Sequence, residues 1–141
     1  MSIRSLRTIV ARQAAVTANR SLSVAEAART MKARNVGALM VVDGTRLVGI
    51  FTERDALFRV LAEGRDPQKT GLGEVMTAQP STIHPDAPVI EALRMMHRGR
   101  FRHLPVVEFD RPLGMVSVRD ALDDDLADLR IALEQQEDST Y

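Results

Sequence analysis

The chain has no cysteine, few aromatic residues (4%) and no net charge at neutral pH. The lack of cysteine excludes disulfides, thiolate metal sites and cysteine nucleophiles. The zero net charge leaves no overall field that would draw nucleic acid or an anionic membrane to the chain. No apolar run approaches the roughly 18 residues of a membrane-spanning helix, and the N-terminus lacks the apolar core of a signal peptide. We therefore expect a cytoplasmic protein without membrane contact, whose 45% apolar residues build a packed core.

The charges are unevenly spread along the chain. Residues 1–20 carry four arginines and no acid, whereas residues 120–141 carry eight acids against Arg130 alone. Solvated faces account for such ends. The alternative is that the two ends attract each other, within one chain or across a dimer.

An internal repeat organises most of the chain. Residues 16–57 align with residues 81–122 at a constant shift of 65 positions, without a gap and with 15 identities in 42 positions. The stretch GIFTERDAL (49–57) returns as GMVSVRDAL (114–122). Such a match indicates a tandem duplication.

Each copy shows the same order of predicted elements. A short extended segment (15–18 or 81–83) precedes a helix, which ends near Asn35–Gly37 in the first copy and at Gly99 in the second. Two strands joined by a hairpin turn follow, at Asp43–Gly44 and at Phe109–Asp110. A last helix starts at Thr52 or Ser117. The pattern predicts an α+β fold made of two β-α-β-β-α repeats.

The first helix of each copy has a predicted cap and a predicted buried face. Ser21 or Ser23 can cap the helix of the first copy, and Asp86 that of the second. The apolar residues keep the spacing of one buried face: Val24, Ala27, Ala28 and Met31, and Val89, Ala92, Leu93 and Met96.

Neither copy is large enough to bury a sizeable core alone. We therefore expect the two to pack face to face through their sheets, with pseudo-twofold symmetry and one shared core. The predicted boundaries are 1–14 for an N-terminal amphipathic segment, 15–63 for the first repeat, 64–79 for a polar linker, 80–125 for the second repeat and 126–141 for a helical tail. The tail is more apolar than a free helix needs, so we expect it to pack on its own domain or on a partner chain.

The junction of the last strand and last helix carries Thr52 and Asp55 in the first copy, and Ser117 and Asp120 in the second. A hydroxyl followed three positions later by a carboxylate is a capping-box pattern, which the residue chemistry alone favours. A helix N-terminus also offers free N–H groups that suit a phosphate, and a carboxylate beside it can accept the hydroxyls of a ribose. Both interpretations can hold together.

The repeats resemble a CBS-domain pair, also called a Bateman module. The family's ligand signature, G-h-x-[S/T]-x-x-D, stands as GIFTERD (49–55) and GMVSVRD (114–120). Its helix signature stands as TIHPDAPVIEA (82–92), altered to TANRSLSVAEA (17–27), and its strand signature as RHLPVV (102–107), less fully as GALMVV (37–42). The resemblance covers about residues 10–125.

The resemblance implies two crossed clefts, each joining the signature of one repeat to strands of the other. Site one would contain Ile50, Thr52, Arg54, Asp55, Ser81, Thr82, Phe101, Arg102 and His103. Site two would contain Val16, Thr17, Ala18, Gly37, Ala38, Met115, Ser117, Arg119 and Asp120. We expect site one, beside the basic run HRGRFRH (97–103), to be the better phosphate site, because site two has the uncharged Gly37 and Ala38 at the matching places.

Catalysis and metal binding find little support in the sequence. No two of the residues His84, His97 and His103 have metal-ligand spacing. Ser117 lacks a nucleophile elbow and an evident base, and the duplication places Asp55 and Asp120 in separate clefts. HRGRFRH is too short, in a chain of zero net charge, to indicate nucleic-acid binding. We expect no enzyme, no metal and no catalytic cofactor.

The predicted function is that of a stand-alone CBS-pair regulatory module. The resemblance implies an adenine nucleotide, AMP, ADP or ATP, ahead of NAD or S-adenosylmethionine. It also implies a homodimer and a regulated protein that the sequence does not identify. Ligand binding would shift the packing of the halves or of two chains. The alternative is a protein-protein interaction or dimerisation module with vestigial clefts.

Overall fold

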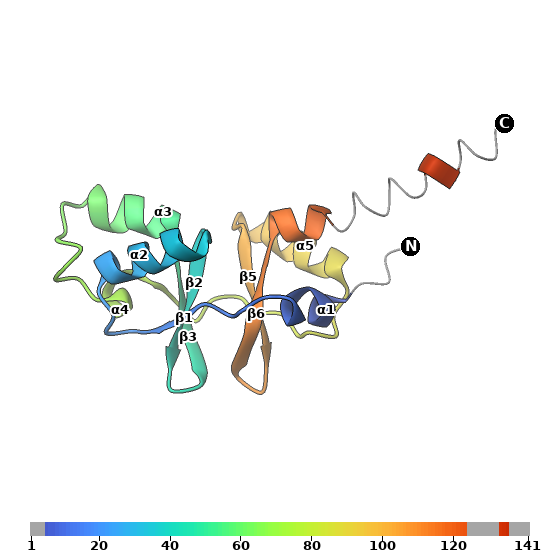
Figure 1. Cartoon of the computed structure of the whole chain (residues 1–141), viewed down its shortest axis with the longest axis horizontal. Helices are drawn as coiled ribbons and strands as arrows, with labels where there is room; N and C mark the ends of the chain where they lie inside the picture. Colours follow the sequence, from blue (N-terminus) through green and yellow to red (C-terminus); the bar gives the residue numbers. More distant parts are fainter. Residues whose placement is uncertain (1–4, 124–132, 136–141) are drawn as a thin grey trace.

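The computed structural model describes residues 5–123 and 133–135. The chain forms two halves whose strands face each other at the centre, with the helices of each half on the outer sides (Figure 1). The two halves meet where strands β3 (Arg46–Thr52) and β6 (Arg111–Ser117) contact each other. The backbone N–H of Leu47 donates a hydrogen bond to the carbonyl of Asp110 across this contact, at 3.1 Å.

The first half is built on a four-stranded sheet of order β1-β2-β3-β4. Its elements are β1 (Thr17–Asn19), α2 (Val24–Arg34), β2 (Ala38–Asp43), β3, α3 (Glu53–Asp55), the π-helical segment η1 (Ala56–Leu61), α4 (Leu72–Val75) and β4 (Thr77–Ala78). β1 runs parallel to β2, and the other neighbours are antiparallel.

The second half repeats this plan with a smaller sheet. It contains α5 (Val89–Gly99), β5 (His103–Glu108), β6 and a helix over residues 118–123, and α1 (Leu6–Ala11) packs on it. β1 has its counterpart in a single parallel bridge between Ile83 and Val106, which lies 65 positions after the Ala18–Val41 pair. The predicted α+β fold with two β-α-β-β-α repeats is confirmed.

Ser23 caps α2, as one of the two expected serines, and Asn35 ends the helix in the left-handed region, as predicted. Two other details of the predicted helices are wrong. In α5 the capping position is Pro88 rather than Asp86, whose carboxylate pairs with Arg7 instead. Ala28, expected on the buried face of α2, is exposed because α2 buries only Val24, Ala27 and Met31.

Each half has its own hydrophobic core, so the expected single shared core is not what forms. The first cluster consists of Val24, Ala27, Met31, Leu39, Val41, Phe51, Val60, Leu72 and Val75. The second consists of Leu6, Val10, Ile83, Val89, Ala92, Met96, Leu104, Val106, Val116 and Ala121. Each core lies between one sheet and the helices that cover its outer face, which leaves the inner faces to meet each other.

The segments that lead into each repeat cross to the opposite half. α1 precedes the first repeat but contributes Leu6 and Val10 to the second core. α4 precedes the second repeat but contributes Leu72 and Val75 to the first core, and β4 extends the first sheet. Residues 64–79, predicted to be a polar linker, therefore end in a helical turn and a strand of the first half. The predicted tail 126–141 lies outside the described residues except for 133–135.

A glycine at each signature makes these crossings possible. A Cβ atom at Gly49 would overlap the sulfur of Met76, just after α4. A Cβ atom at Gly114 would lie 2.7 Å from Cβ of Val10 in α1. Because only glycine leaves room for so close an approach, the signature glycines serve packing between the lead-in segments and the sheets.

Candidate ligand-binding clefts

Both signatures fold as reciprocal helix caps. In the first, the N–H of Asp55 donates to the Thr52 hydroxyl at 3.2 Å, and the N–H of Thr52 donates to Asp55 Oδ2 at 3.0 Å. In the second, the N–H of Asp120 donates to the Ser117 hydroxyl at 3.0 Å, and the N–H of Ser117 donates to Asp120 Oδ2 at 3.1 Å. The capping interpretation is therefore confirmed for both copies.

The two carboxylates differ in their surroundings. Asp55 is buried, with 7% of the residue exposed, and its Oδ1 lies 3.5 Å from Nε of Arg59 one helical turn later. Asp120 is only half-buried, and its Oδ2 accepts a 3.5 Å hydrogen bond from the side-chain amide of Gln13. Within the described part of the chain, Asp120 Oδ1 accepts no hydrogen bond. Asp120 Oδ1 therefore has no protein partner among the described residues, whereas Oδ1 of Asp55 pairs with the guanidinium of Arg59.

A hollow of about 900 Å³ opens beside Asp120, between the two halves. Residues from both repeats line it: Gln13, Ala14, Ala15, Val16, Asn35, Val36, Gly37, Ala38, Met40, Glu53, Arg102, His103, Met115, Ser117, Val118, Arg119, Asp120, Leu122 and Asp123. We call this hollow the second cleft. It contains seven of the nine residues predicted for site two, and the other two, Thr17 and Ala18, lie in β1 without lining it.

His103 links the second cleft to the first repeat. A Cβ atom on Gly37 would lie 3.4 Å from Nε2 of His103 and 3.2 Å from Oε1 of Glu53, so the three residues are close neighbours. Burial lowers the pKa of His103 below its ordinary value of 6.5, and the nearby Arg102 adds to this, while Glu53 and Asp120 act in the opposite direction. The imidazole therefore stands in the cleft as a neutral hydrogen-bonding group at neutral pH.

A separate hollow, of about 860 Å³, lies next to the end of α5, and we call it the basic hollow. Its lining combines basic and apolar side chains: Arg54, Leu93, Met96, His97, Arg98, Arg100, Phe101, Arg102 and Val118. Arg54 also stacks over the ring of Phe58, with 5.1 Å from its guanidinium carbon to the ring centre. Arg102 lines both hollows.

The residues predicted for site one do not gather in one hollow. Arg54, Phe101 and Arg102 line the basic hollow, whereas His103 lines the second cleft. The remaining five line neither of these two hollows: Ile50, Thr52, Asp55, Ser81 and Thr82. The basic side chains of His97, Arg98, Arg100 and Arg102 line the basic hollow together with Phe101, and Asp55 is not among its lining residues.

Gln13 and Glu53 line the second cleft and were not predicted. Gln13 precedes the aligned repeat, which begins at residue 16, so the duplication carried no signal for it. Glu53 lies inside GIFTERD, but the second repeat has Val118 at the equivalent position, so the two repeats share no polar residue there that would indicate a site. The crossing of α1 to the second half is what brings Gln13 to Asp120.

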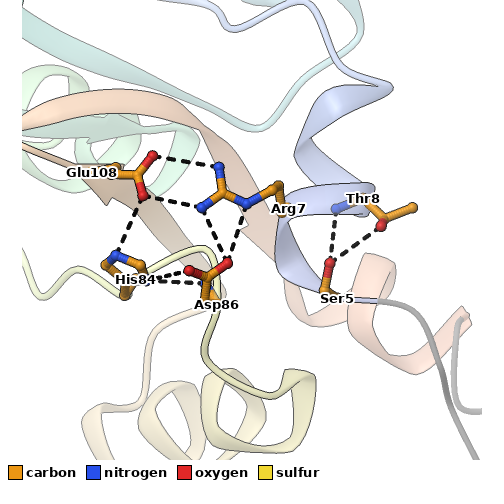
Figure 2. Close-up of polar contacts among 6 residues, drawn as sticks. All are labelled: Ser5, Arg7, Thr8, His84, Asp86 and Glu108. Carbon is orange, nitrogen blue, oxygen red and sulfur yellow. Dashed lines mark hydrogen bonds and ion pairs between the residues drawn. The ribbon is translucent and has the colours of Figure 1, made fainter.

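Three potential metal ligands also come together outside the clefts. Ligand atoms of His84, Asp86 and Glu108 lie within 4.8 Å of one another. Figure 2 shows the guanidinium of Arg7 among them, 3.1 Å from Asp86 and 3.0 Å from Glu108. Hydrogen bonds to Glu108 and then to Asp86 raise the pKa of Arg7. The cluster holds α1 on the second half through an ion-pair network, whose cation is already supplied by Arg7.

Comparison with known proteins identifies the class of protein. The family model described as CBS domain matches twice, over residues 6–62 and 72–126. The chain therefore belongs to the CBS-domain family and carries two CBS repeats in tandem. The first match begins at α1 and the second at α4, so each lead-in segment is matched with the repeat that follows it in the sequence.

Relatives and solved structures agree with this assignment. The chain is 39% identical over 122 residues to the CBS domain-containing protein CBSCBSPB2 of Arabidopsis thaliana; the match covers 86% of this chain but only 23% of that relative. A putative signal-transduction protein with CBS domains from Burkholderia ambifaria has a TM-score of 0.82 and 30% identity, over 89% of this chain and 96% of that one. A hexameric CBS-CP12 protein from cyanobacteria has a TM-score of 0.76 and 30% identity, over 86% and 68%.

None of the described helices combines the length and the apolar character that crossing a bilayer requires.

Proposed function

We propose that this protein is a regulatory CBS pair that binds an adenine nucleotide or a related adenosyl ligand in the second cleft. The observation that carries the proposal is the half-buried Asp120, which lines a hollow formed by both repeats and whose Oδ1 accepts no hydrogen bond from the described residues. A ligand in that hollow touches both halves, so binding changes their relative packing. The solved relative from Burkholderia ambifaria is described as a signal-transduction protein, which supports a regulatory role rather than catalysis.

The lining of the second cleft supports a nucleoside ligand. The carboxylate of Asp120 suits the hydroxyls of a ribose, and Val16, Ala38 and Met40 offer apolar surface to a base. Arg102 and Arg119 can pair with phosphate oxygens at the mouth of the cleft. A phosphorylated ligand such as AMP, ADP or ATP satisfies all three kinds of group, whereas S-adenosylmethionine has a sulfonium cation at the 5′ position, where a nucleotide carries its phosphate, and offers the arginines only its methionine carboxylate.

The choice of cleft departs from the sequence-based expectation that site one is the better phosphate site. That expectation gave Arg102 and His103 to Asp55, whereas both side chains line the hollow of Asp120. Asp55 is buried and paired with Arg59, so a ribose there would have to displace that contact. We therefore propose the second cleft as the principal ligand site.

A thermal-shift panel with AMP, ADP, ATP, NAD and S-adenosylmethionine tests the proposal. A ligand at a hundred times its Kd stabilises the folded state by about 2.7 kcal/mol. This corresponds to a rise of several degrees in Tm for a domain of this size. We expect the phosphorylated nucleotides to give the largest shift.

Two matched variants locate the site. Asp120→Ala is expected to abolish the shift, whereas Asp55→Ala is expected to lower the starting Tm but keep the shift. A shift that survives Asp120→Ala and disappears in Asp55→Ala contradicts the choice of cleft. The absence of a shift with every ligand contradicts nucleotide binding and favours the interaction module.

Self-association is the second part of the proposal. η1 exposes Leu57, Phe58 and Leu61, at 49%, 52% and 71%, and Leu122 on the last described helix is 45% exposed. Apolar side chains grouped on one helix favour burial against another chain. The cyanobacterial CBS-CP12 protein of similar fold is described as hexameric, which supports self-association of this chain. We propose a homodimer in which η1 contributes to the contact, and a ligand signal passed to a further protein through the dimer.

A further inference from the structure

Gln13 connects the lead-in helix α1 to the carboxylate of the second cleft. Its Oε1 accepts a hydrogen bond from the N–H of Met115 at 3.2 Å, and its Nε2 donates to Asp120 Oδ2 at 3.5 Å. Asp120 Oδ2 also accepts a hydrogen bond from the N–H of Ser117 at 3.1 Å. One oxygen of Asp120 is thus held from two sides, while Oδ1 points to no donor among the described residues.

The position of Gln13 depends on how α1 is docked. Its backbone N–H donates to the carbonyl of Val10 at 3.0 Å, and Val10 is 4% exposed in the second core. A Cβ atom on Gly114 would approach Gln13 Oε1 to 3.0 Å and Val10 more closely still. α1 and the Gln13 side chain therefore rest on the same glycine of the signature.

The opposite end of α1 is fixed by Arg7. Its guanidinium pairs with Asp86 and Glu108, as drawn in Figure 2, and its backbone N–H donates to the carbonyl of Pro85 at 3.1 Å. Both ends of α1 thus attach to the second half, one at a surface ion-pair network and the other at the cleft.

The first half connects its carboxylate to a lead-in helix in a different way. The position 65 residues after Gln13 is Ala78, which pairs with Gly49 through the backbone of β4 and carries no amide side chain. Asp55 is approached by Arg59 of its own helical segment instead. Arg59 in turn donates from Nη1 to the carbonyls of Val75 and Met76 at the end of α4, at 3.1 and 3.0 Å. Both carboxylates are therefore connected to a lead-in helix, Asp55 through the Arg59 side chain and Asp120 directly through Gln13, and of the two it is Asp120 that lines the second cleft.

We propose that Gln13 positions the Asp120 carboxylate for the ligand and thereby couples occupancy of the second cleft to the docking of α1. This inference rests on the proposed function of that cleft. A carboxylate already fixed by two donors loses less freedom when a ligand hydroxyl binds its other oxygen. By linkage, a ligand that uses the fixed carboxylate strengthens the docking of α1 by the same factor. α1 is then an element on which a partner can detect the bound state.

Calorimetric titration of the full chain with AMP, ADP and ATP in turn measures the first half of the inference. Gln13→Ala is expected to weaken binding roughly tenfold, the effect of removing a hydrogen bond to a charged group. Gln13→Glu is expected to weaken it as well, although its carboxylate still accepts the N–H of Met115, because it repels Asp120. Gln68→Ala changes an exposed glutamine of the segment between the repeats and is expected to bind like the wild type.

Hydrogen exchange of the backbone amides of residues 6–13 measures the second half. We expect nucleotide to slow exchange in the wild type and to leave it unchanged in Gln13→Ala. Exchange of the buried amides of β2 checks that each variant is folded. A role of Gln13 in packing alone would leave Gln13→Glu close to the wild type in both measurements.

The outcomes separate this inference from the proposed function. Nucleotide binding that is equal in the wild type and Gln13→Ala overturns the inference and leaves the proposed function standing. Binding without any change in the exchange of α1 does the same. If no nucleotide binds the wild type, the proposed function fails and the inference fails with it.

Discussion

Two aspartates occupy equivalent places in the duplicated signature, and their surroundings assign them different tasks. Both cap the helix that follows them. Asp55 is buried against Arg59, whereas Asp120 borders a hollow with one oxygen unpaired in the described part of the chain. Duplication supplied two equivalent caps, with Thr52 in one copy and Ser117 in the other, and the neighbours of each cap decide whether a ligand can reach it.

Removing the buried carboxylate should cost more stability than removing the half-buried one. Asp55→Ala loses a cap, which is worth about 1–2 kcal/mol, and also removes the carboxylate that pairs with Arg59. Asp120→Ala loses the cap and a 3.5 Å hydrogen bond from the uncharged amide of Gln13. Urea unfolding of both variants measures the difference, and a larger loss for Asp120→Ala would contradict this assignment.

The lowered pKa of His103 predicts a loss of stability in acid. Because burial lowers the folded-state pKa below the ordinary value of 6.5, the unfolded chain binds more protons as the pH falls through that value. The contribution is fully present above pH 6.5 and is lost progressively below it. Unfolding free energies of the wild type and His103→Gln, compared at pH 7.5 and pH 5.5 with the exposed His97→Gln as control, test this. An equal pH dependence in the wild type and His103→Gln would contradict it.

Several residues expected in one cleft do lie together, but the direction of the His103 side chain was not predicted. Gly37, Ala38, Ser117 and Asp120 line a common hollow, as the crossed-cleft hypothesis expected. His103 was expected with Asp55 in site one and lines the second cleft, with Nε2 beside Gly37 and Glu53, since the direction of a side chain at a strand end depends on the twist and packing of two sheets. Such a choice cannot be read from spacing alone.

At the scale of elements, the helix and strand order followed from periodicity and capping residues. What the sequence did not indicate was the exchange of α1 and α4 between the halves. The amphipathic pattern predicted for residues 1–14 agrees with α1, which has six residues, but it does not indicate on which half the helix packs, and α4, with four residues, is too short for a periodic signal. Their place is determined by long-range packing of Val10 against Gly114 and of Met76 against Gly49.

Gly114→Ala is expected to loosen α1 from the second half. The added methyl would lie 2.7 Å from Cβ of Val10 and 3.0 Å from Gln13 Oε1, too close for either to remain. Faster hydrogen exchange over residues 6–13 would report the loss. In Gly73→Ala the nearest atom is the Cβ of Arg20, at 3.3 Å on the exposed side of α4, so this control should leave α1 unchanged. Unchanged exchange in Gly114→Ala would show that α1 docks without the glycine.

At the scale of the whole molecule, two small cores joined through their sheets leave an apolar helical surface uncovered. Leu57, Phe58 and Leu61 lie on η1, at the outer helical side of the first half (Figure 1). The sequence predicted a homodimer by family resemblance, and these side chains give that prediction a physical basis that can be tested.

Phe58→Glu is expected to shift the protein from dimer to monomer, because it places a charge in the proposed contact. Light scattering coupled to size exclusion measures the molar mass. Phe109→Glu changes an aromatic residue that is 90% exposed at the tip of the β5–β6 turn and should leave the mass unchanged. A dimer that persists in Phe58→Glu would place the contact elsewhere.

The number of nucleotides bound per chain shows whether the second cleft is the ligand site. Calorimetric titration with the nucleotide that gives the largest thermal shift should yield one site per chain in the wild type. One site should remain in Asp55→Ala and none in Asp120→Ala. Loss of binding in Asp55→Ala with retention in Asp120→Ala, or no binding by the wild type, would contradict a sensor whose ligand occupies the second cleft.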